Sequence, residues 1–384
     1  MPGFELISAE ERRKVNNLFN EIKKKKRIGF YNSNNVANFE KTFSNLIGSK
    51  YAVAVSSGTA AIKIALVAAG VKRGDEVITQ AFTFIATVEA ILDIGAKPII
   101  TQINETLNMC PIDLKKKITN KTKAIIPVHM LGVSCQIDEI KKIAKKKKIV
   151  VIDDNCEALG AKWRENLLGN QFEICTWSFD TGKTITTGEG GMITTNNKKY
   201  YQLCKEYKDH GHQNNPKFSR GRDTARIYGF NFRMTELNAA IGLAQLKKVK
   251  YIVKKNKNNY EKIFNSLKKF KGLKFREIPE YCTPLYDCLI FNLRSKPLAS
   301  RFVRLINSYG LVTKNVPDAI QWHFAKYWKH IFLLSKKKLH IRFKKSDDLL
   351  SRSVAIPIYV NEKERSLRNR INIFIKTLKK LEIK

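Results

Sequence analysis

The chain has no long apolar segment. None of its hydrophobic runs approaches the roughly 20 residues that a membrane-spanning helix requires. The opening stretch MPGFELISAEERRK also lacks the apolar region of a secretory signal peptide. We therefore expect a cytoplasmic protein that does not span a membrane.

Cysteine is sparse as well. The 384 residues include 7 cysteines, an odd number, and no two of them are spaced as CxxC. This pattern does not suit a disulfide framework and is typical of reduced thiols. His210 and His212 do not fall at metal-ligand spacing with other histidines or cysteines. We expect no metal site.

Acidic residues are few compared with basic ones. The 34 Asp and Glu residues face 71 Lys and Arg residues, for a formal net charge of +37. Such a charge is compatible with a nucleic-acid partner. The lysine runs at 23–26, 145–148 and 336–338 are nevertheless scattered and lack interleaved aromatic residues, which favours a solvated basic surface. We expect no nucleic-acid partner, and a basic nucleic-acid-binding protein is the alternative from a different class of function.

Apolar residues are plentiful: hydrophobic residues make up 43% of the chain, enough for a sizeable core. Between about residues 50 and 200, short β-branched runs alternate with helical patterns. Runs without in-and-out alternation are typical of a mostly parallel sheet that helices cover on both faces. From residue 236 the pattern predicts one or two long amphipathic helices, followed by a second, smaller domain.

Three strand ends carry polar residues, and ligands of such sheets gather at the carboxyl ends of the strands. The first predicted strand leads into SSGTAAIKIAL, where a helix begins directly after Ser56 and Ser57. The free N–H groups and the positive dipole end of that helix suit a phosphate, and the hydroxyl of Thr59 adds a donor. An ordinary helix cap is the alternative interpretation.

The strand IVVIDDN ends in Asp153 and Asp154. Because side chains alternate along a strand, only one of these carboxylates points into a ligand site. A single carboxylate there suits a cationic ring nitrogen. The alternative for Asp154 is a cap on the following helix.

Lys183 stands in SFDTGKTITTGEG, a loop rich in Gly and Thr. A lysine in this position suits Schiff-base formation with an aldehyde, provided that its pKa is lowered. The alternative is a surface lysine in a flexible loop. Together, a phosphate cradle, a strand-end carboxylate and a loop lysine are what pyridoxal 5'-phosphate requires.

Several strings resemble the DegT/DnrJ/EryC1/StrS family of pyridoxal-phosphate-dependent sugar aminotransferases. They are SSGTAAIKIAL, GDEVITQAFTFIATVEAI, TKAIIPVHMLG, VIDDNCEALGAKW, SFDTGKTITTGEGGMITTN and YGFNFRMTELNAAIGLAQLKKV, in the family's order. The resemblance implies an α/β fold-type I transferase with a mostly parallel central sheet flanked by helices, and a homodimer with shared active sites. It divides the chain into an N-terminal arm (1–29), a large cofactor-binding domain (30–250) and a smaller C-terminal α/β domain (251–384).

The resemblance also assigns individual residues. Lys183 matches the family's Schiff-base lysine, Asp154 the carboxylate that faces the ring nitrogen, and Phe84 the aromatic residue that stacks on the ring. Glu157 stands near the cofactor's 3-oxygen, where many members carry Gln or His. The matching phosphate ligands are Gly58, Thr59 and Ser178, with Asn231 contributed by the neighbouring subunit.

Two further segments are candidate substrate contacts. The loop KDHGHQNNPKFSRGRD contains His210, His212, Arg220 and Arg222, and the planar forks of the arginines suit a phosphate or a carboxylate. Its alternative is an exposed basic loop. His323 in DAIQWHFAKYW is expected to add another wall to the pocket, with an aromatic core patch as the alternative.

These residues predict an aminotransferase that moves an amino group from L-glutamate to a keto-sugar for the synthesis of a surface polysaccharide or lipopolysaccharide. A nucleotide-linked 4-keto or 3-keto hexose is the expected class of substrate, and an 8-keto octulosonate stays open. A pyridoxal-phosphate-dependent sugar dehydratase is the alternative enzyme. Related dehydratases carry His at the position of Lys183, which favours amino transfer.

Overall fold

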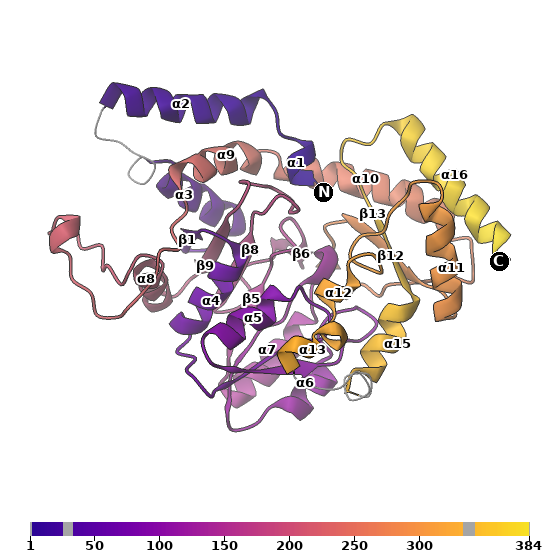
Figure 1. Ribbon diagram of the computed structural model, residues 1–384, viewed down its shortest axis with the longest axis horizontal. Coiled ribbons are helices and arrows are strands. Elements are labelled where there is room, and N and C mark those ends of the chain that lie inside the picture. Colours follow the sequence, from indigo (N-terminus) through magenta and orange to yellow (C-terminus); the bar gives the residue numbers. More distant parts are fainter. Residues whose placement is uncertain (1, 26–33, 333–341, 384) are drawn as a thin grey trace.

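The computed structural model describes residues 2–25, 34–332 and 342–383. The lysine run at 336–338 and Lys26 lie outside these residues. The elements with the large sheet form one side of the molecule, and the helices at 249–267, 296–307 and 364–380 lie on the other (Figure 1). The segment around Phe324 and Trp328 packs against the core of the large sheet. The long helix α2 (Ala9–Lys25) lies over α9 (Glu236–Leu246).

A seven-stranded sheet forms the centre of the larger part. Its order is β1-β9-β8-β5-β4-β2-β3, and all seven strands lie in the stretch from about residue 50 to 200 where the sequence predicts a mostly parallel sheet. The neighbours from β8 to β3 pair in parallel, whereas β9 runs antiparallel to both β1 and β8. The bounds are β1 (Tyr51–Val55), β2 (Glu76–Gln80), β3 (Lys97–Thr101), β4 (Thr122–Ile125), β5 (Val150–Asp154), β8 (Ile174–Ser178) and β9 (Gly191–Thr195).

Helices cover this sheet, and the strands are correspondingly apolar. Strands β2 and β9 are buried along their whole length. Helix α4 packs against β8 and β9, while α3 packs against β1 and α9. The remaining bounds in this part are α1 (Pro2–Glu5), α3 (Asn35–Ile47), α4 (Gly58–Ala68), α5 (Ala86–Asp93), α6 (Pro111–Lys117), η1 (Met130–Gly132), α7 (Ile137–Lys147), α8 (Lys198–Tyr207) and η2 (Arg220–Arg222).

The predicted helical stretch from residue 236 consists of two helices, α9 and α10 (Val249–Leu267). Helix α10 leads into an antiparallel sheet with the order β10-β12-β13, whose apolar core includes Phe291, Phe302 and Phe374. The other C-terminal elements are β10 (Lys274–Phe275), β12 (Cys288–Asn292), α11 (Lys296–Asn307), α12 (Ile320–His323), η3 (Ala325–Tyr327), α13 (Lys329–Phe332), α15 (Lys344–Arg352), β13 (Ser353–Pro357) and α16 (Glu364–Lys380).

A third, small sheet joins segments that are distant in sequence. Strand β11 (Cys282–Thr283) pairs with β6 (Lys162–Trp163), which also pairs with β7 (Asn166–Leu167). The sequence patterns did not predict these two-residue strands, because they are too short to show any periodicity. Within the described ranges, no helix combines the length and apolar character needed to cross a membrane.

Candidate active site

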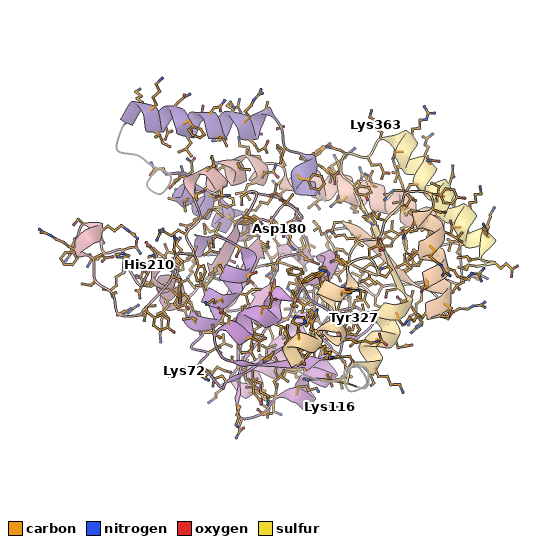
Figure 2. All side chains as sticks on the ribbon, in the orientation of Figure 1. Lys72, Lys116, Asp180, His210, Tyr327 and Lys363 are labelled. Atoms are coloured by element: carbon orange, nitrogen blue, oxygen red, sulfur yellow. The ribbon has the colours of Figure 1, made fainter. Side chains whose placement is uncertain are left out.

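A pocket of about 280 Å³ lies where β5 and β8 end and α4 begins. Asp180, one of its lining residues, is labelled in the all-side-chain view (Figure 2). The pocket brings together most of the residues that the sequence singled out. These are Gly58, Thr59, Phe84, Asp154, Glu157, Ser178 and Lys183.

The start of α4 forms one end of this pocket. Ser57 is extended and caps the helix, since its hydroxyl oxygen accepts the N–H of Ala60 at 3.1 Å. Gly58 approaches the end of β8 so closely that a Cβ atom there would lie 2.8 Å from Cβ of Ser178. Ser57 therefore caps the helix, while Gly58 and Thr59 line the pocket. We call the start of α4 at Gly58 and Thr59 the cradle, and the first N–H groups of such a helix suit an anion.

Asp154 is buried at the end of β5 and faces the pocket. Its Oδ1 accepts the backbone N–H of Cys156 and its Oδ2 accepts the hydroxyl of Thr87, both at 3.1 Å. Burial raises the pKa of this carboxyl although both donors oppose the rise. Asp153, the preceding residue, is instead fully buried beside His129, with 2.8 Å between Oδ1 and Nε2. The two neighbouring carboxylates thus occupy different environments.

Lys183 lies inside the pocket, with only 17% of its side chain exposed. Its Nζ atom is 3.7 Å from Oε1 of Glu157 and 3.8 Å from Oδ2 of Asp180. Burial lowers the pKa of Lys183, but the two carboxylates outweigh burial and hold the pKa above its ordinary value. The sequence analysis expects a lowered pKa for Lys183 if it is to form a Schiff base. In this structure the neighbouring carboxylates raise the pKa of Lys183 instead.

Glu157 is the main counter-charge of Lys183. Its Oε2 accepts the N–H of Leu131 at 3.0 Å, and its Oε1 accepts the side-chain amide of Asn315 at 3.4 Å. Burial raises the pKa of Glu157, but nearby positive charges, Lys183 foremost, lower it to about 2. The carboxylate is therefore ionised at any pH where the protein would be assayed.

His323, from the C-terminal part of the chain, lies beside Phe84, one of the residues that line the pocket. Its ring lies 5.2 Å from the ring of Phe84, tilted by 49°. Its Nδ1 is 2.8 Å from the carbonyl oxygen of Ala319, and burial lowers its pKa. A backbone hydrogen bond also joins the two segments: the N–H of Thr83 donates to the carbonyl oxygen of His323 at 3.0 Å.

His323 contacts the lining residue Phe84 but does not itself line the pocket. Five further predicted residues do not line it either: His210, His212, Arg220, Arg222 and Asn231. They belong to the segment after α8, which projects from the body of the molecule (Figure 1), and His210 is labelled in Figure 2. Arg220 donates two hydrogen bonds of 2.6 Å to Asp209. Asn231, which is exposed, forms a β-bridge with Asp209, which is buried. Nδ1 of His212 is 3.4 Å from Oδ2 of Asp223.

Sequence reasoning missed some residues of the site. Thr87 orients Asp154, and Asn315 contacts Glu157. The hydroxyl of Thr87 sits one helical turn after Thr83, and their oxygens are 2.9 Å apart. The string FTFIAT contained this signal as two threonines four residues apart. Asn315 had no such signal, because a distant loop brings it to the pocket.

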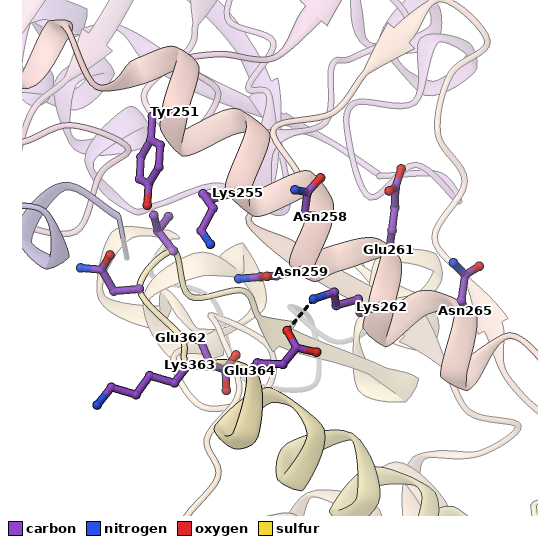
Figure 3. Close-up of a pocket in the computed structure, with 12 residues that line it drawn as sticks. Tyr251, Lys255, Asn258, Asn259, Glu261, Lys262, Asn265, Glu362, Lys363 and Glu364 are labelled. Atoms are coloured by element: carbon purple, nitrogen blue, oxygen red, sulfur yellow. Dashed lines mark hydrogen bonds and ion pairs between the residues drawn. The ribbon is translucent and has the colours of Figure 1, made fainter.

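A larger groove of about 650 Å³ lies elsewhere, between α10 and residues 360–364 (Figure 3). An ion pair of 2.5 Å between Lys262 and Glu364 joins its two walls. The lining mixes lysines, carboxylates and amides, and the predicted site residues are not among them. This groove lacks the strand-end chemistry of the smaller pocket.

The donors of the smaller pocket fit pyridoxal 5'-phosphate. The buried amine of Lys183 suits the aldehyde, the carboxylate of Asp154 suits the ring nitrogen, and the cradle at Gly58 suits the phosphate. Across the part of the chain that the structure describes, histidine, cysteine and carboxylate side chains form no group able to hold a metal ion.

Known proteins are similar to this chain in sequence. A profile described as the DegT/DnrJ/EryC1/StrS aminotransferase family matches residues 9–373. GDP-perosamine synthase of Escherichia coli O157:H7 is 41% identical over 238 residues, which cover 61% of this chain and 64% of that protein. An uncharacterized protein of Methanocaldococcus jannaschii is 34% identical over 331 residues, which cover 84% of each chain.

Solved structures agree with these matches. An aminotransferase from Psychrobacter cryohalolentis superposes with a TM-score of 0.88 at 27% identity, over 98% of both chains. The NtdA protein of Bacillus subtilis with bound PMP, the amino form of the cofactor, gives a TM-score of 0.85 at 27% identity, over 97% of this chain and 83% of that one. The predicted α/β transferase fold is confirmed, and the family and these structures indicate dependence on pyridoxal 5'-phosphate. The chain belongs to the DegT/DnrJ/EryC1/StrS aminotransferase family.

Proposed function

We propose that this protein is a sugar aminotransferase that transfers an amino group from L-glutamate to a nucleotide-linked keto-sugar in polysaccharide biosynthesis. The observation that carries the proposal is one pocket that holds the Lys183 amine, the Asp154 carboxylate and the open start of α4. The similarity to GDP-perosamine synthases supports a nucleotide-linked substrate.

Each residue has a distinct role in this proposal. When bound, the cofactor supplies an electron sink that makes a C–H bond beside the amino group easier to break. Nζ of Lys183 takes a proton from one carbon and delivers it to another. Asp154 keeps the ring nitrogen protonated, and Thr87 holds that carboxylate in place.

In this proposal Phe84 stacks on the cofactor ring, as the resemblance implies, and His323 beside it forms a further wall where a sugar would enter. The Phe84 ring is 43% exposed, although it lies among buried residues, so it offers a flat apolar face. The His323 ring supports it from the C-terminal part. Such a wall orients a ligand and keeps water away from the reacting atoms.

The active form in this proposal is a homodimer with shared sites. Asn231, His210, His212, Arg220 and Arg222 lie outside the pocket of their own chain. Tyr228 and Phe230, in the same projecting segment, are 76% and 45% exposed, and large exposed apolar side chains suit a protein interface. A second copy of the chain would receive this segment and bring Asn231 to its phosphate cradle.

The proposal includes the three-part division into residues 1–29, 30–250 and 251–384 and a location in the cytoplasm. A separate apolar cluster around Phe291 and Phe302 supports an independent C-terminal core. All seven cysteines are free, as is typical of a reducing compartment.

The experiment is an amino-transfer assay. The purified protein, loaded with pyridoxal phosphate, is incubated with L-glutamate and a panel of nucleotide-linked 3-keto and 4-keto sugars and an 8-keto octulosonate. Formation of 2-oxoglutarate together with one amino-sugar supports the proposal and identifies the substrate. Loss of a sugar hydroxyl without amino transfer would instead indicate the dehydratase.

A further inference from the structure

The N-terminal segment touches the loop that carries Lys183. The N–H of Gly3 donates to the carbonyl oxygen of Lys183 at 3.1 Å. A Cβ atom on Gly3 would lie 2.8 to 2.9 Å from backbone atoms of Lys183, Ile185 and Thr186. Backbone atoms cannot move away as easily as the end of a flexible side chain, so a side chain larger than that of glycine would not fit at position 3.

A second connection joins the same loop to helix α2. The side-chain oxygen of Gln245, a buried residue of α9, accepts the N–H of Thr186 at 3.4 Å. The amide of Gln245 donates to Glu11 at 2.8 Å. Glu11 is itself buried, accepts the N–H of Ser8 at 2.8 Å and forms an ion pair with Lys248. Residues 3–11 are thus joined to the Lys183 loop directly through Gly3 and indirectly through Glu11 and Gln245.

The segment is anchored to parts of the chain outside the active pocket. The backbone N–H of Asn361 donates to Oε2 of Glu5 at 3.1 Å, and its side-chain amide donates to the carbonyl of Glu5 at 2.5 Å. Nζ of Lys248 donates to the carbonyl of Leu6 at 2.6 Å. Figure 1 shows the result, with α1 beside the junction of α9 and α10.

These contacts matter because the loop contains no helix or strand, so its shape depends on separate hydrogen bonds, such as that from the N–H of Thr187 to the carbonyl of Phe179 at 2.9 Å. Its sequence TGKTITTGEG is rich in glycine and threonine, which do not stabilise a helix. A catalytic group that is misplaced by about 1 Å loses much of its rate advantage, by factors on the order of 100. Fixing the carbonyl of Lys183 fixes the base of the side chain whose amine must meet the cofactor.

We propose that residues 3–11 are a positioning clamp for Lys183, with Gly3 as the contact and Asn361 as the remote anchor. This inference rests on the proposed role of Lys183. The clamp contributes no group to the chemistry. It holds the loop backbone in the conformation that lets the amine react.

The first test is Gly3→Ala. In the cofactor-free protein, amide hydrogen exchange of residues 183–187 should become faster. Attachment of added pyridoxal phosphate to Lys183, followed by visible absorbance, should slow by about tenfold or more. A fall in kcat with little change in the KM for the keto-sugar would accompany it, because the substitution changes the Lys183 loop and not His323, the expected sugar contact.

The second test uses a matched pair in the groove of Figure 3. Asn361→Ala removes the side-chain bond to Glu5 and should change both measurements in the same direction by about threefold, the effect of one hydrogen bond. Asn258→Ala changes the same residue type at an exposed position of α10, labelled in Figure 3, and should match the wild type.

Two results would overturn the clamp. One is wild-type exchange and attachment rates in both Gly3→Ala and Asn361→Ala. The other is an equal change in Asn258→Ala. If pyridoxal phosphate did not attach to Lys183 even in the wild type, the proposed function would fail instead, and the exchange of residues 183–187 would still decide whether the N-terminal segment holds the loop.

Discussion

At the scale of single residues, the site depends on which side chains share a pocket. The sequence singled out Lys183 because a lysine among Gly and Thr after a strand is unusual in this chain, and the structure places its side chain in the pocket. The sequence alone could not show whether the pKa of Lys183 is raised or lowered. That direction depends on Glu157 and Asp180, which the fold places 3.7 and 3.8 Å from the amine.

Asp154→Asn tests the carboxylate that faces the ring nitrogen. The amide keeps the shape and can still contact Thr87, so we expect the cofactor to bind. An amide does not keep a ring nitrogen protonated, so kcat should fall by about 100-fold or more. The measurement is kcat per bound cofactor, with retention checked by absorbance. A wild-type kcat would remove Asp154 from this role.

Glu157→Gln tests the electrostatics around Lys183. The Glu157 carboxylate raises the pKa of Lys183, so its removal should lower that pKa. Only the neutral amine attacks an aldehyde, and a lower pKa yields more neutral amine at a given pH. The pH profile for cofactor attachment should therefore move to lower pH in the variant. A profile that stays in place or moves upward would contradict the ion pair.

At the scale of elements, the start of α4 is the part of the site that sequence reasoning reached most directly. SSGTAA predicts a helix start after a strand, and the structure has β1 end at Val55 and α4 begin at Gly58. The antiparallel direction of β9 could not be read from its composition, because a buried strand is apolar in either direction. The sequence named His323 as a candidate but not Asn315, whose contact with Glu157 joins segments 158 residues apart and leaves no local pattern.

Gly58→Ala tests the cradle formed by α4 and β8. The added Cβ would lie 2.8 Å from Cβ of Ser178 and 3.2 Å from Sγ of Cys156, so the helix start and the strand end must move apart. Alanine itself is favoured in helices, which limits any loss of helix stability. We expect the Kd for pyridoxal phosphate to rise by about tenfold or more, the effect of a misplaced anion site.

A titration of cofactor-free protein gives this Kd, and a thermal unfolding curve serves as the control. An unchanged affinity would show that the phosphate does not bind at the start of α4. A general loss of folding in the unfolding curve would point to packing and not to the cradle.

At the scale of the whole molecule, the chain carries a net charge of +37 and has the fold of an aminotransferase. The net charge alone is compatible with a nucleic-acid-binding protein, whereas the pocket that contains Lys183 and Asp154 indicates an enzyme. Composition cannot distinguish these cases, because a solvated lysine and a lysine in a binding surface contribute the same formal charge.

Subunit complementation tests the shared site. Lys183→Ala and Asn231→Trp should each be inactive as homodimers. After mixing and subunit exchange, a heterodimer would contain one site with both defects and one with neither, so activity should return. The rate of 2-oxoglutarate formation measures the recovery, and mass spectrometry of the mixed dimers verifies exchange. Exchange without recovery would mean that Asn231 does not serve the other chain's site.

The central claim is that Lys183 is the residue that holds the cofactor in an aminotransferase site, and reductive labelling tests it most directly. The wild-type protein and Lys183→Ala are each loaded with pyridoxal phosphate, reduced with borohydride, digested and analysed by mass spectrometry. We predict that the wild type carries the reduced cofactor on the peptide containing SFDTGKT and that Lys183→Ala carries none and has no transaminase activity. A label on another lysine in the active wild-type protein, or full activity of Lys183→Ala, would contradict this account.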